Sequence, residues 1–370
     1  MIDTRWTYAP DIVSAPGETL QELLDERGIT QKDLAARMGR PIKTINEIVK
    51  GKAKIVPDTA VELERALGLP ASFWNEREAH YRGYLASVDA DRRASRWLGW
   101  LDELPLKEMM GAGALPRLRL TSGNRKTLLD AALKFFGVAS PDEWKKIYSQ
   151  PQAAYRRTRK DQSDAGAIAA WLRLGELQAE QCDCEPYDEQ KFKDVITRIR
   201  ALTVQPPETF QPEMTRFCAS AGVVLAFVPA IPRAHVSGAA RWMNRRAVIQ
   251  LSLYGKTNDR FWFTFFHEAG HILKHARDEV FLDELTSSDR NDPLEKEADR
   301  FAADTLVPPH TAASLSLLGS DSASVRAFAT RIGIHPGIVV GRLQHEELIR
   351  FNSPLNSLKT SYRWKDTASD

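Results

Sequence analysis

The stretch from Phe261 to Arg277 restricts what this chain can fold into more than any other. It reads F-W-F-T-F-F-H-E-A-G-H-I-L-K-H-A-R, is apolar or aromatic at most positions and contains no proline. This pattern predicts a buried helix of about four turns. Any fold that buries such a helix must also find partners for the polar side chains of His267, Glu268 and His271.

The spacing of these polar residues points to a metal. Residues four apart share one face of a helix, so the imidazoles of His267 and His271 can bind one ion, with Glu268 beside it. H-E-x-x-H supplies two nitrogen ligands for Zn²⁺ and a carboxylate that accepts a proton from water on the metal. The alternative is a pair of hydrogen-bonded core histidines. The apolar surroundings favour the metal because one ion satisfies all three buried groups. His275 is expected to be an ordinary helix-end histidine.

A third ligand is predicted from the stretch between residues 292 and 307, D-P-L-E-K-E-A-D-R-F-A-A-D-T-L-V. Its first aspartate is expected to cap a helix. Glu295 and Asp299 then share a face. We predict that Glu295 completes a site of two histidines and one glutamate, and that Asp299 holds an imidazole by its outer nitrogen. Glu297 competes for the ligand role, and a solvated charge is the alternative for Glu295.

Composition limits the class of protein only broadly. A chain of 370 residues predicts two or three domains, with 43% hydrophobic and 27% charged residues, as in soluble globular proteins. The net charge of +2 says little about partners. Three cysteines, Cys182, Cys184 and Cys218, fit neither a disulfide framework nor a zinc ribbon. Without a signal peptide or an apolar run of about 20 residues, we expect a cytoplasmic protein that does not bind membranes.

The first part of the chain, residues 17 to 84, shows short helical patterns separated by glycines. A second helix is capped by Thr30 and ends at Gly39, and two more begin at Pro41 and Pro57. The T-Q-x-x-L-A-x-x-M-G spacing is typical of a helix-turn-helix. On the third helix, the side chains expected to face inward are those of Ile42, Ile45, Ile48 and Val49.

Local charge supports a DNA-binding role for this module. Between Thr30 and Ile55 there are seven basic residues and two acidic ones, an excess that suits phosphate neutralisation. The alternative is a helical bundle with a solvated basic face. The predicted DNA contacts are Lys43, Thr44, Asn46 and Glu47 to base edges, Thr30 and Gln31 to phosphate, and the basic residues Arg40, Lys50 and Lys52.

The rest of the chain divides into a helical stretch and a mixed one. Helical periodicity covers Trp97–Met110, Arg125–Phe136, Asp142–Ser149 and Ala165–Gln181, with tryptophans expected to pack in a core. From Phe192 onward we expect helices through Ile199 and over Pro212–Ala221, then strands over residues 223–228, 237–243 and 247–253, with Asn244 and Arg245 in the turn of a hairpin.

The sheet is expected to lie beside the H-E-x-x-H helix. One of the hairpin strands is predicted to form its edge and to accept an extended peptide as an added strand. Residues 324 to 350 carry a second pattern of two helices around a glycine turn. For these we expect ordinary packing against the metal-binding domain rather than a second DNA-reading element.

Two known families resemble this chain. Residues 10 to 80, with I-K-T-I-N-E-I-V-K-G-K and L-G-L-P-A-S-F-W, resemble the XRE-type DNA-binding domain of HigA antitoxins. Residues 165 to 362 resemble the ImmA/IrrE family of metallopeptidase-like proteins. The second resemblance rests on H-E-A-G-H-I-L-K-H, on E-K-E-A-D-R-F-A from Glu295, on the V-P after Leu306, and on I-G-I-H-P-G-I-V-V-G-R-L-Q from Ile332.

The ImmA/IrrE resemblance implies a zincin fold and, for some members, cleavage of a repressor. It implies His267, His271 and Glu295 as zinc ligands and Glu268 as general base. All four positions are filled as that pattern requires.

Together these observations predict an α+β protein that is mostly α-helical. The expected parts are a five-helix helix-turn-helix bundle over residues 1–85, a helical middle region over 86–190, and a zincin-like domain with a small sheet on the H-E-x-x-H helix over 191–370. One hypothesis is a DNA-binding regulator whose zinc peptidase domain cleaves a repressor, a toxin or itself. The other is a HigA-like antitoxin and repressor whose zincin-like domain binds or senses a toxin without turnover. Double-stranded operator DNA and a protein substrate or cognate toxin are the expected partners, and a homodimer is kept open.

Overall fold

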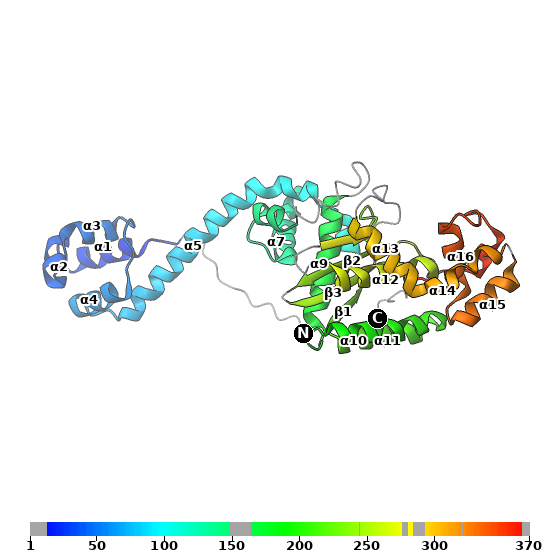
Figure 1. The fold of residues 1–370 in the computed structure, drawn as a ribbon. Helices are drawn as coiled ribbons and strands as arrows, with labels where there is room; N and C mark the ends of the chain where they lie inside the picture. The colour runs from blue at the N-terminus through cyan, green and yellow to red at the C-terminus, as the bar shows by residue number, and fades with distance from the viewer. Residues whose placement is uncertain are drawn as a thin grey trace, which may run out of the picture. The chain divides into compact units, whose positions relative to one another are not determined.

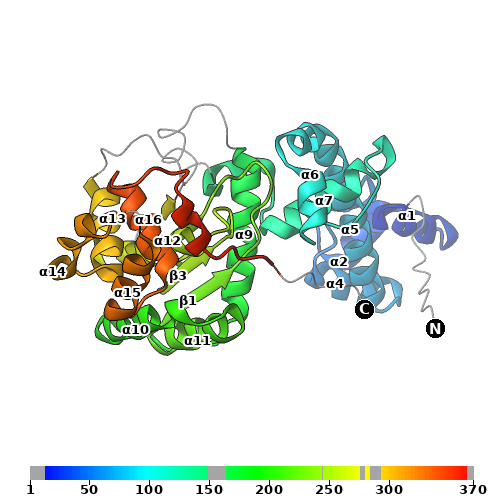
Figure 2. The same cartoon turned by 90° about the vertical axis from the view of Figure 1, so that its right-hand side faces the viewer.

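The computed structural model describes residues 13–148, 164–243, 245–275, 280–283, 293–319 and 321–364. The chain divides into two compact units, Met1–Arg96 and Trp97–Asp370, drawn in Figures 1 and 2. Both are mostly helical and the second contains a sheet, so the expected α+β class is confirmed. Among the described residues, no helix has the length and apolar character needed to cross a bilayer. The domain boundaries near residues 85 and 190 stay predictions.

The first unit has the expected five helices: α1 (Pro16–Glu26), α2 (Gln31–Met38), α3 (Ile42–Val49), α4 (Pro57–Leu67) and α5 (Ala71–Trp97). Gly39 ends α2 with φ of 63°, a left-handed conformation that glycine adopts at little cost. The inward position predicted for Ile42 is wrong, because its side chain is 52% exposed. Each three-residue step rotates a side chain by about 60° around a helix, so Ile42 turns away from the face that buries Ile45 and Ile48.

The second unit begins with a helical part. Its elements are the 3₁₀ helices η1 (Leu98–Glu103) and η2 (Ser122–Asn124), helices α6 (Leu106–Gly111) and α7 (Arg125–Phe136), a helix over residues 141–148, and α9 (Ala165–Gln181). Trp100 and Trp144 both pack against Phe136, with ring centroids 6.1 and 5.7 Å away. The prediction that these tryptophans pack in a core is confirmed.

The sheet has four strands: β1 (Val223–Phe227), β2 (Gly238–Met243), β3 (Arg246–Leu251) and β4 (Val280–Asp283). Their order is β1-β3-β2-β4, with β1 parallel to β3 and the other pairs antiparallel. The predicted hairpin of β2 and β3 is present, although Asn244 of its turn lies outside the described residues. The prediction that a hairpin strand forms the edge is wrong, because β4 pairs with β2 and β1 pairs with β3.

Helices cover both faces of the sheet. Side chains alternate between the two faces of a strand, so Val224 and Val248 pack with Ala179 of α9. Leu225 and Ile249 point the other way and join the large core that contains the aromatic residues of α12 (Asn258–Lys274). The expected arrangement, a small sheet packed on the H-E-x-x-H helix, is confirmed.

The remaining helices surround α12. They are α10 (Glu189–Ala201), η3 (Leu202–Val204), α11 (Pro207–Ser220), α13 (Pro293–Leu306), α14 (Pro309–Ala312), η4 (Leu315–Leu317), α15 (Ser322–Ile332), α16 (Pro336–His345) and η5 (Pro354–Leu358). Helix α11 begins five residues before the predicted start, because Pro207 fits the first helical turn. The predicted cap Asp292 lies outside the described residues.

Helix α16 and the segment after it hold the start of α12. Residues of α16 from Gly337 to Val340 are buried, and α16 packs on α12, so the expected packing role of this segment is confirmed. The side-chain oxygen of Asn258 accepts hydrogen bonds from the backbone N–H of Thr360, at 3.1 Å, and of Asp259, at 3.0 Å. The N–H of Tyr362 donates to the carbonyl of Lys256 at 2.7 Å.

Candidate metal centre

Two helices, α12 and α13, approach closely at the candidate metal centre. A Cβ on Gly270 would lie 3.2 Å from the Cα of Ala298, so only a glycine fits between the two helices without a shift. On α13, Ala298 and Ala302 are fully buried and present small side chains at this contact. This close packing places the first turns of α13 opposite the H-E-x-x-H residues.

Three donor groups converge where the helices meet. The Nε2 atoms of His267 and His271 lie 2.9 Å apart. Carboxylate oxygens of Glu295 lie 3.1 Å from Nε2 of His267 and 3.6 Å from Nε2 of His271. Two ligand atoms bound tetrahedrally at 2.0–2.1 Å from one zinc ion are about 3.3 Å apart. The donor set and its spacing therefore fit a zinc ion, and these are the residues that group together as candidate metal ligands in the described part of the chain.

Burial and hydrogen bonding set the protonation of His271 and Glu295. His267 and His271 are each 2% exposed. Burial lowers the pKa of His271 to about 4, which leaves its imidazole neutral at physiological pH. For Glu295 burial acts in the opposite direction, but hydrogen bonds with His267 and His271 hold the pKa of its carboxyl well below the usual range. A neutral imidazole and an ionised carboxylate are the forms that bind zinc.

Each imidazole is held by its outer nitrogen. Nδ1 of His267 lies 2.9 Å from Oδ1 of Asp299, so Asp299 holds an imidazole as expected from the sequence. Nδ1 of His271 lies 2.8 Å from Nδ1 of His275, and Nε2 of His275 lies 3.5 Å from Glu297.

His275 lies at the end of α12, as expected, where it is the C-terminal cap, and its side chain has a further role beside His271 that we did not expect. It continues the four-residue spacing of His267 and His271, and this spacing was the signal that could have revealed it. Glu297, the rival for the ligand role, lies against His275 instead of joining the donor group.

Glu268 is fully buried beside the donor group. A Cβ on Gly238 would lie 2.6 Å from Oε1 of Glu268, so the first residue of β2 must be a glycine to leave room for this carboxylate. The general-base candidate therefore lies between the metal-binding helix and the sheet. In the register of the sheet, Gly238 pairs with Asp283 at the end of the edge strand β4.

The candidate DNA-contacting residues of the first unit fall into two groups. Arg40 forms a two-pronged ion pair with Glu62, at 2.9 and 3.0 Å, which ties the end of α2 to α4. The hydroxyl of Thr30 caps α2 by accepting from the N–H of Asp33 at 3.1 Å. These two side chains already have structural partners.

The other candidates lie on α3 or near it. The amide of Gln31 accepts from Asn46 at 3.2 Å and donates to Gln21 at 2.7 Å, so it joins α2 to α1 and α3. The side chain of Lys43 is 84% exposed. Among the remaining candidates, Lys50 and Lys52 are exposed, whereas Thr44, Asn46 and Glu47 are half-buried. The first turn of α3 also carries the exposed Ile42, which the sequence had assigned to the core.

Comparison with protein families identifies both parts of the chain. Residues 20–74 match the helix-turn-helix family model, and residues 229–344 match the M78 peptidase family model, described as the IrrE N-terminal-like domain. A curated relative, an uncharacterised helix-turn-helix transcriptional regulator from Escherichia coli, YddM, is 30% identical over 59 residues. That match covers 16% of this chain and 63% of the relative's length.

Two solved structures each resemble a short part of the chain. The Pseudomonas aeruginosa antitoxin HigA, solved with the higBA promoter, is 29% identical, covers 22% of this chain and 90% of its own, and has a TM-score of 0.22. An addiction module antidote protein of the HigA family from Coxiella burnetii is 25% identical, covers 23% of this chain and 92% of its own, and has a TM-score of 0.21. The family matches therefore assign a helix-turn-helix region to residues 20–74 and a region like the IrrE N-terminal-like domain of the M78 peptidase family to residues 229–344.

Proposed function

We propose that this protein is a DNA-binding regulator whose C-terminal domain is a zinc endopeptidase acting on a regulatory protein in the cytoplasm. The observation that carries the proposal is the convergence of His267, His271 and Glu295, together with the buried carboxylate of Glu268 beside them. A purely structural zinc site uses four protein ligands and has no need of a base. Three donors and an adjacent acid are the arrangement of a hydrolytic centre.

The two histidines and Glu295 would hold the ion, and Asp299 and His275 would fix the orientation of the two imidazoles through their outer nitrogens. When bound, zinc supplies Lewis acidity that acidifies water and polarises a carbonyl group. Glu268 would act as general base, since its carboxylate is buried inside the site beside the three donors.

A peptide substrate would bind along the sheet. Strand β4 is the edge next to β2 among the described strands, and it ends opposite Gly238, the residue that touches Glu268. An extended peptide added to this edge would gain backbone hydrogen bonds and would bring one of its carbonyl groups toward the donor cluster. The substrate class is therefore a protein with an accessible extended segment, such as a repressor, a toxin or this chain itself.

The first unit would bring this activity to an operator. The exposed Lys43, Lys50 and Lys52 would neutralise phosphates. Helix α3 would enter the major groove of double-stranded DNA, where Ile42 would contact a thymine methyl group. Arg40 is left out of this surface because two nitrogens of its guanidinium already donate to the carboxylate of Glu62.

The decisive experiment compares the zinc-loaded wild type with Glu268→Gln, incubated with the products of neighbouring genes. We expect metal-dependent cleavage of one of them, or of the protein itself, by the wild type. The variant should show at least a hundredfold loss of cleavage while it keeps its zinc and its DNA affinity. Undiminished cleavage by Glu268→Gln would remove the base role. Toxin binding without cleavage by either protein would favour the alternative, a HigA-like antitoxin and repressor.

A further inference from the structure

A basic pocket adjoins Glu268 at the end of the sheet. It encloses about 200 Å³ of space open to solvent, and its lining includes Ser237, Ser252, Lys256, Arg260 and Thr264. None of its lining residues in the described part of the chain is acidic. The pocket therefore offers positive charge and hydroxyl groups without a competing carboxylate.

The pocket shares a wall with the candidate catalytic site. Thr264 lies one helical turn before Glu268 on α12, a rise of about 5.4 Å. Ser237 directly precedes Gly238. A Cβ at Gly238 would meet both Oε1 of Glu268 and Cγ2 of Thr264 at 2.6 Å. Because successive residues of an extended peptide are about 3.3 Å apart, a side chain in this pocket belongs to one of the first two residues beside the cleaved bond.

One lining side chain has an unused hydrogen-bonding group. Ser237 is 3% exposed, and its hydroxyl has no hydrogen-bond partner among the described residues. A buried hydroxyl without a partner costs free energy, so a ligand that accepts a hydrogen bond from it gains affinity. The neighbouring Ser252 hydroxyl already donates to the carbonyl of Val236, at 2.6 Å.

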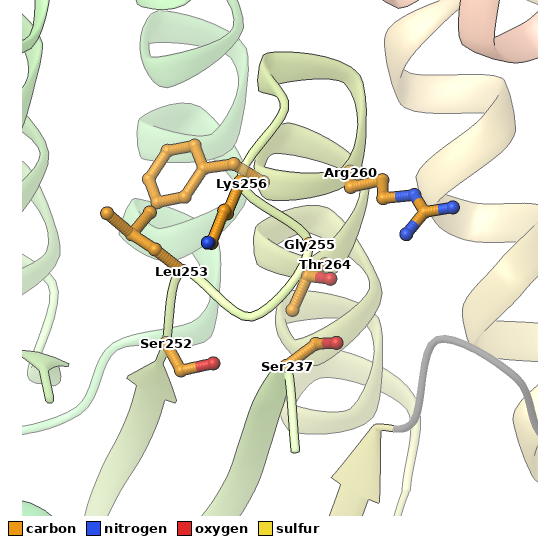
Figure 3. A pocket seen from close by; sticks show the side chains of 8 residues that line it. Ser237, Ser252, Leu253, Gly255, Lys256, Arg260 and Thr264 are labelled. Atoms are coloured by element: carbon orange, nitrogen blue, oxygen red, sulfur yellow. The ribbon is translucent and has the colours of Figure 1, made fainter. Parts of the chain in front are cut away.

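The view of the pocket shows which groups point together. In Figure 3 the hydroxyl oxygens of Ser237 and Thr264 and the side chain of Arg260 point to the same side of the view, whereas the amino group of Lys256 points to the other side. Arg260, Thr264 and Glu268 follow one another every four residues on one face of α12. Lys256 adds a second positive charge from the loop after β3. Neither Lys256 nor Arg260 forms an ion pair with a side chain in the described part of the chain.

We propose that this pocket is a substrate subsite that selects a carboxylate, supplied by an aspartate or glutamate side chain within two residues of the cleaved bond. The proposal rests on the proposed peptidase function. The carboxylate would accept hydrogen bonds from Ser237 and Thr264 and form an ion pair with Arg260. A carboxylate is the match for this lining because it is planar, anionic and a pure acceptor. The limited volume favours a side chain over a larger charged group.

The test uses peptide hydroxamates, which bind a zinc site whether or not it turns over substrate. One series carries Glu, Gln or Lys at the first or second residue from the hydroxamate, each with an amidated C-terminus. A further compound carries Gln and a free C-terminal acid. Dissociation constants are measured by titration calorimetry on the zinc-loaded full chain. We expect Glu to bind about tenfold more tightly than Gln, and Lys more weakly than both. If only the free acid binds tightly, the pocket recognises a chain terminus and the proposal of a side-chain subsite is wrong.

Three variants test which residues cause the preference for Glu over Gln. Arg260→Gln should reduce the preference for Glu over Gln to within about twofold. The exposed Arg326 of α15 is the charge-matched control, and Arg326→Gln should keep the full preference. Ser237→Ala should weaken the preference about threefold without lowering the melting temperature, since its hydroxyl makes no hydrogen bond within the described part of the chain.

The outcomes separate the two proposals. Equal binding of the Glu and Gln compounds to the wild type, or an undiminished preference in Arg260→Gln, overturns the subsite while leaving the metal centre intact. Failure of every hydroxamate to bind removes the metal centre, and the subsite with it.

Discussion

The candidate metal centre and the proposed DNA-reading surface both consist of polar side chains, but they differ in their exposure to water. His267 and His271 are each 2% exposed, whereas the side chain of Lys43 is 84% exposed. A buried imidazole must be ligated or hydrogen-bonded, so a few residues in an apolar helix identify a site and its chemistry. An exposed lysine is already satisfied by water, so a basic face is compatible with DNA or with solvent alone. Burial therefore decides how much function a sequence pattern reveals.

The largest expected effect is the loss of the metal on removing one buried ligand. The protein should purify with about one zinc ion, and His271→Ala should lower its zinc affinity by a factor of about a thousand or more. Metal analysis by mass spectrometry after dialysis measures this. His310→Ala, which changes an exposed histidine of α14, is the control and should keep the zinc. Full zinc content in His271→Ala would show that the buried pair is held by hydrogen bonds alone.

A smaller loss of zinc affinity is expected when a residue that contacts a ligand is changed. His275→Ala should lower zinc affinity about ten- to hundredfold, because Nδ1 of His271 loses the group that orients its ring. His275→Asn should recover part of the affinity, since its amide can reach the same nitrogen. Competition with a fluorescent zinc chelator measures both variants. Equal affinities in the wild type and His275→Ala would assign His275 to packing.

A still smaller effect on zinc affinity is expected from a change at the contact between α12 and α13. Gly270→Ala would gain about 1 kcal/mol of helix propensity but would press a methyl group against the backbone of α13, a kind of overpacking that costs about 1–3 kcal/mol. We expect a net loss of stability and a several-fold loss of zinc affinity, because Glu295 moves with α13. Gly83→Ala in α5 is the matched control. Its Cβ would meet nothing within 4 Å, so that variant should be as stable as the wild type or more so. Thermal unfolding with and without zinc gives both comparisons.

The smallest effect is expected on DNA affinity, when one exposed lysine of the first unit is changed. Lys43→Ala should weaken binding to operator DNA about three- to tenfold and reduce the salt slope of the affinity by about 0.9. Lys107→Ala, an exposed lysine of α6 in the other unit, should leave both unchanged. Gel-shift titrations at several fixed salt concentrations measure this. An identical slope for Lys43→Ala would place this lysine off the DNA.

Features set by local sequence were predicted well, whereas features set by tertiary packing were not. Helices with clear start and stop residues, such as α7 and α9, were predicted to the residue. The pairing of Asp299 with an imidazole was also predicted from helical spacing, although the spacing did not say that this imidazole is His267. The short strand β4 was missed because four residues are too few to show a period. The role of His275 depends on how α13 lies against α12, a tertiary arrangement that is set partly by the absence of a side chain at Gly270.

The anchoring of α12 by the last described segment has a consequence for the order of events during synthesis. The backbone of Thr360 bonds to Asn258, and that of Tyr362 bonds to Lys256, while the indole N–H of Trp262 donates to the hydroxyl of Tyr362 at 3.3 Å. After H-E-x-x-H has been translated, the ribosome must add about ninety further residues before these anchors have even been synthesised. The helix-turn-helix unit can fold well before that point. A nascent chain would thus complete its helix-turn-helix unit first, and the packing around α12 only after Tyr362 has been made.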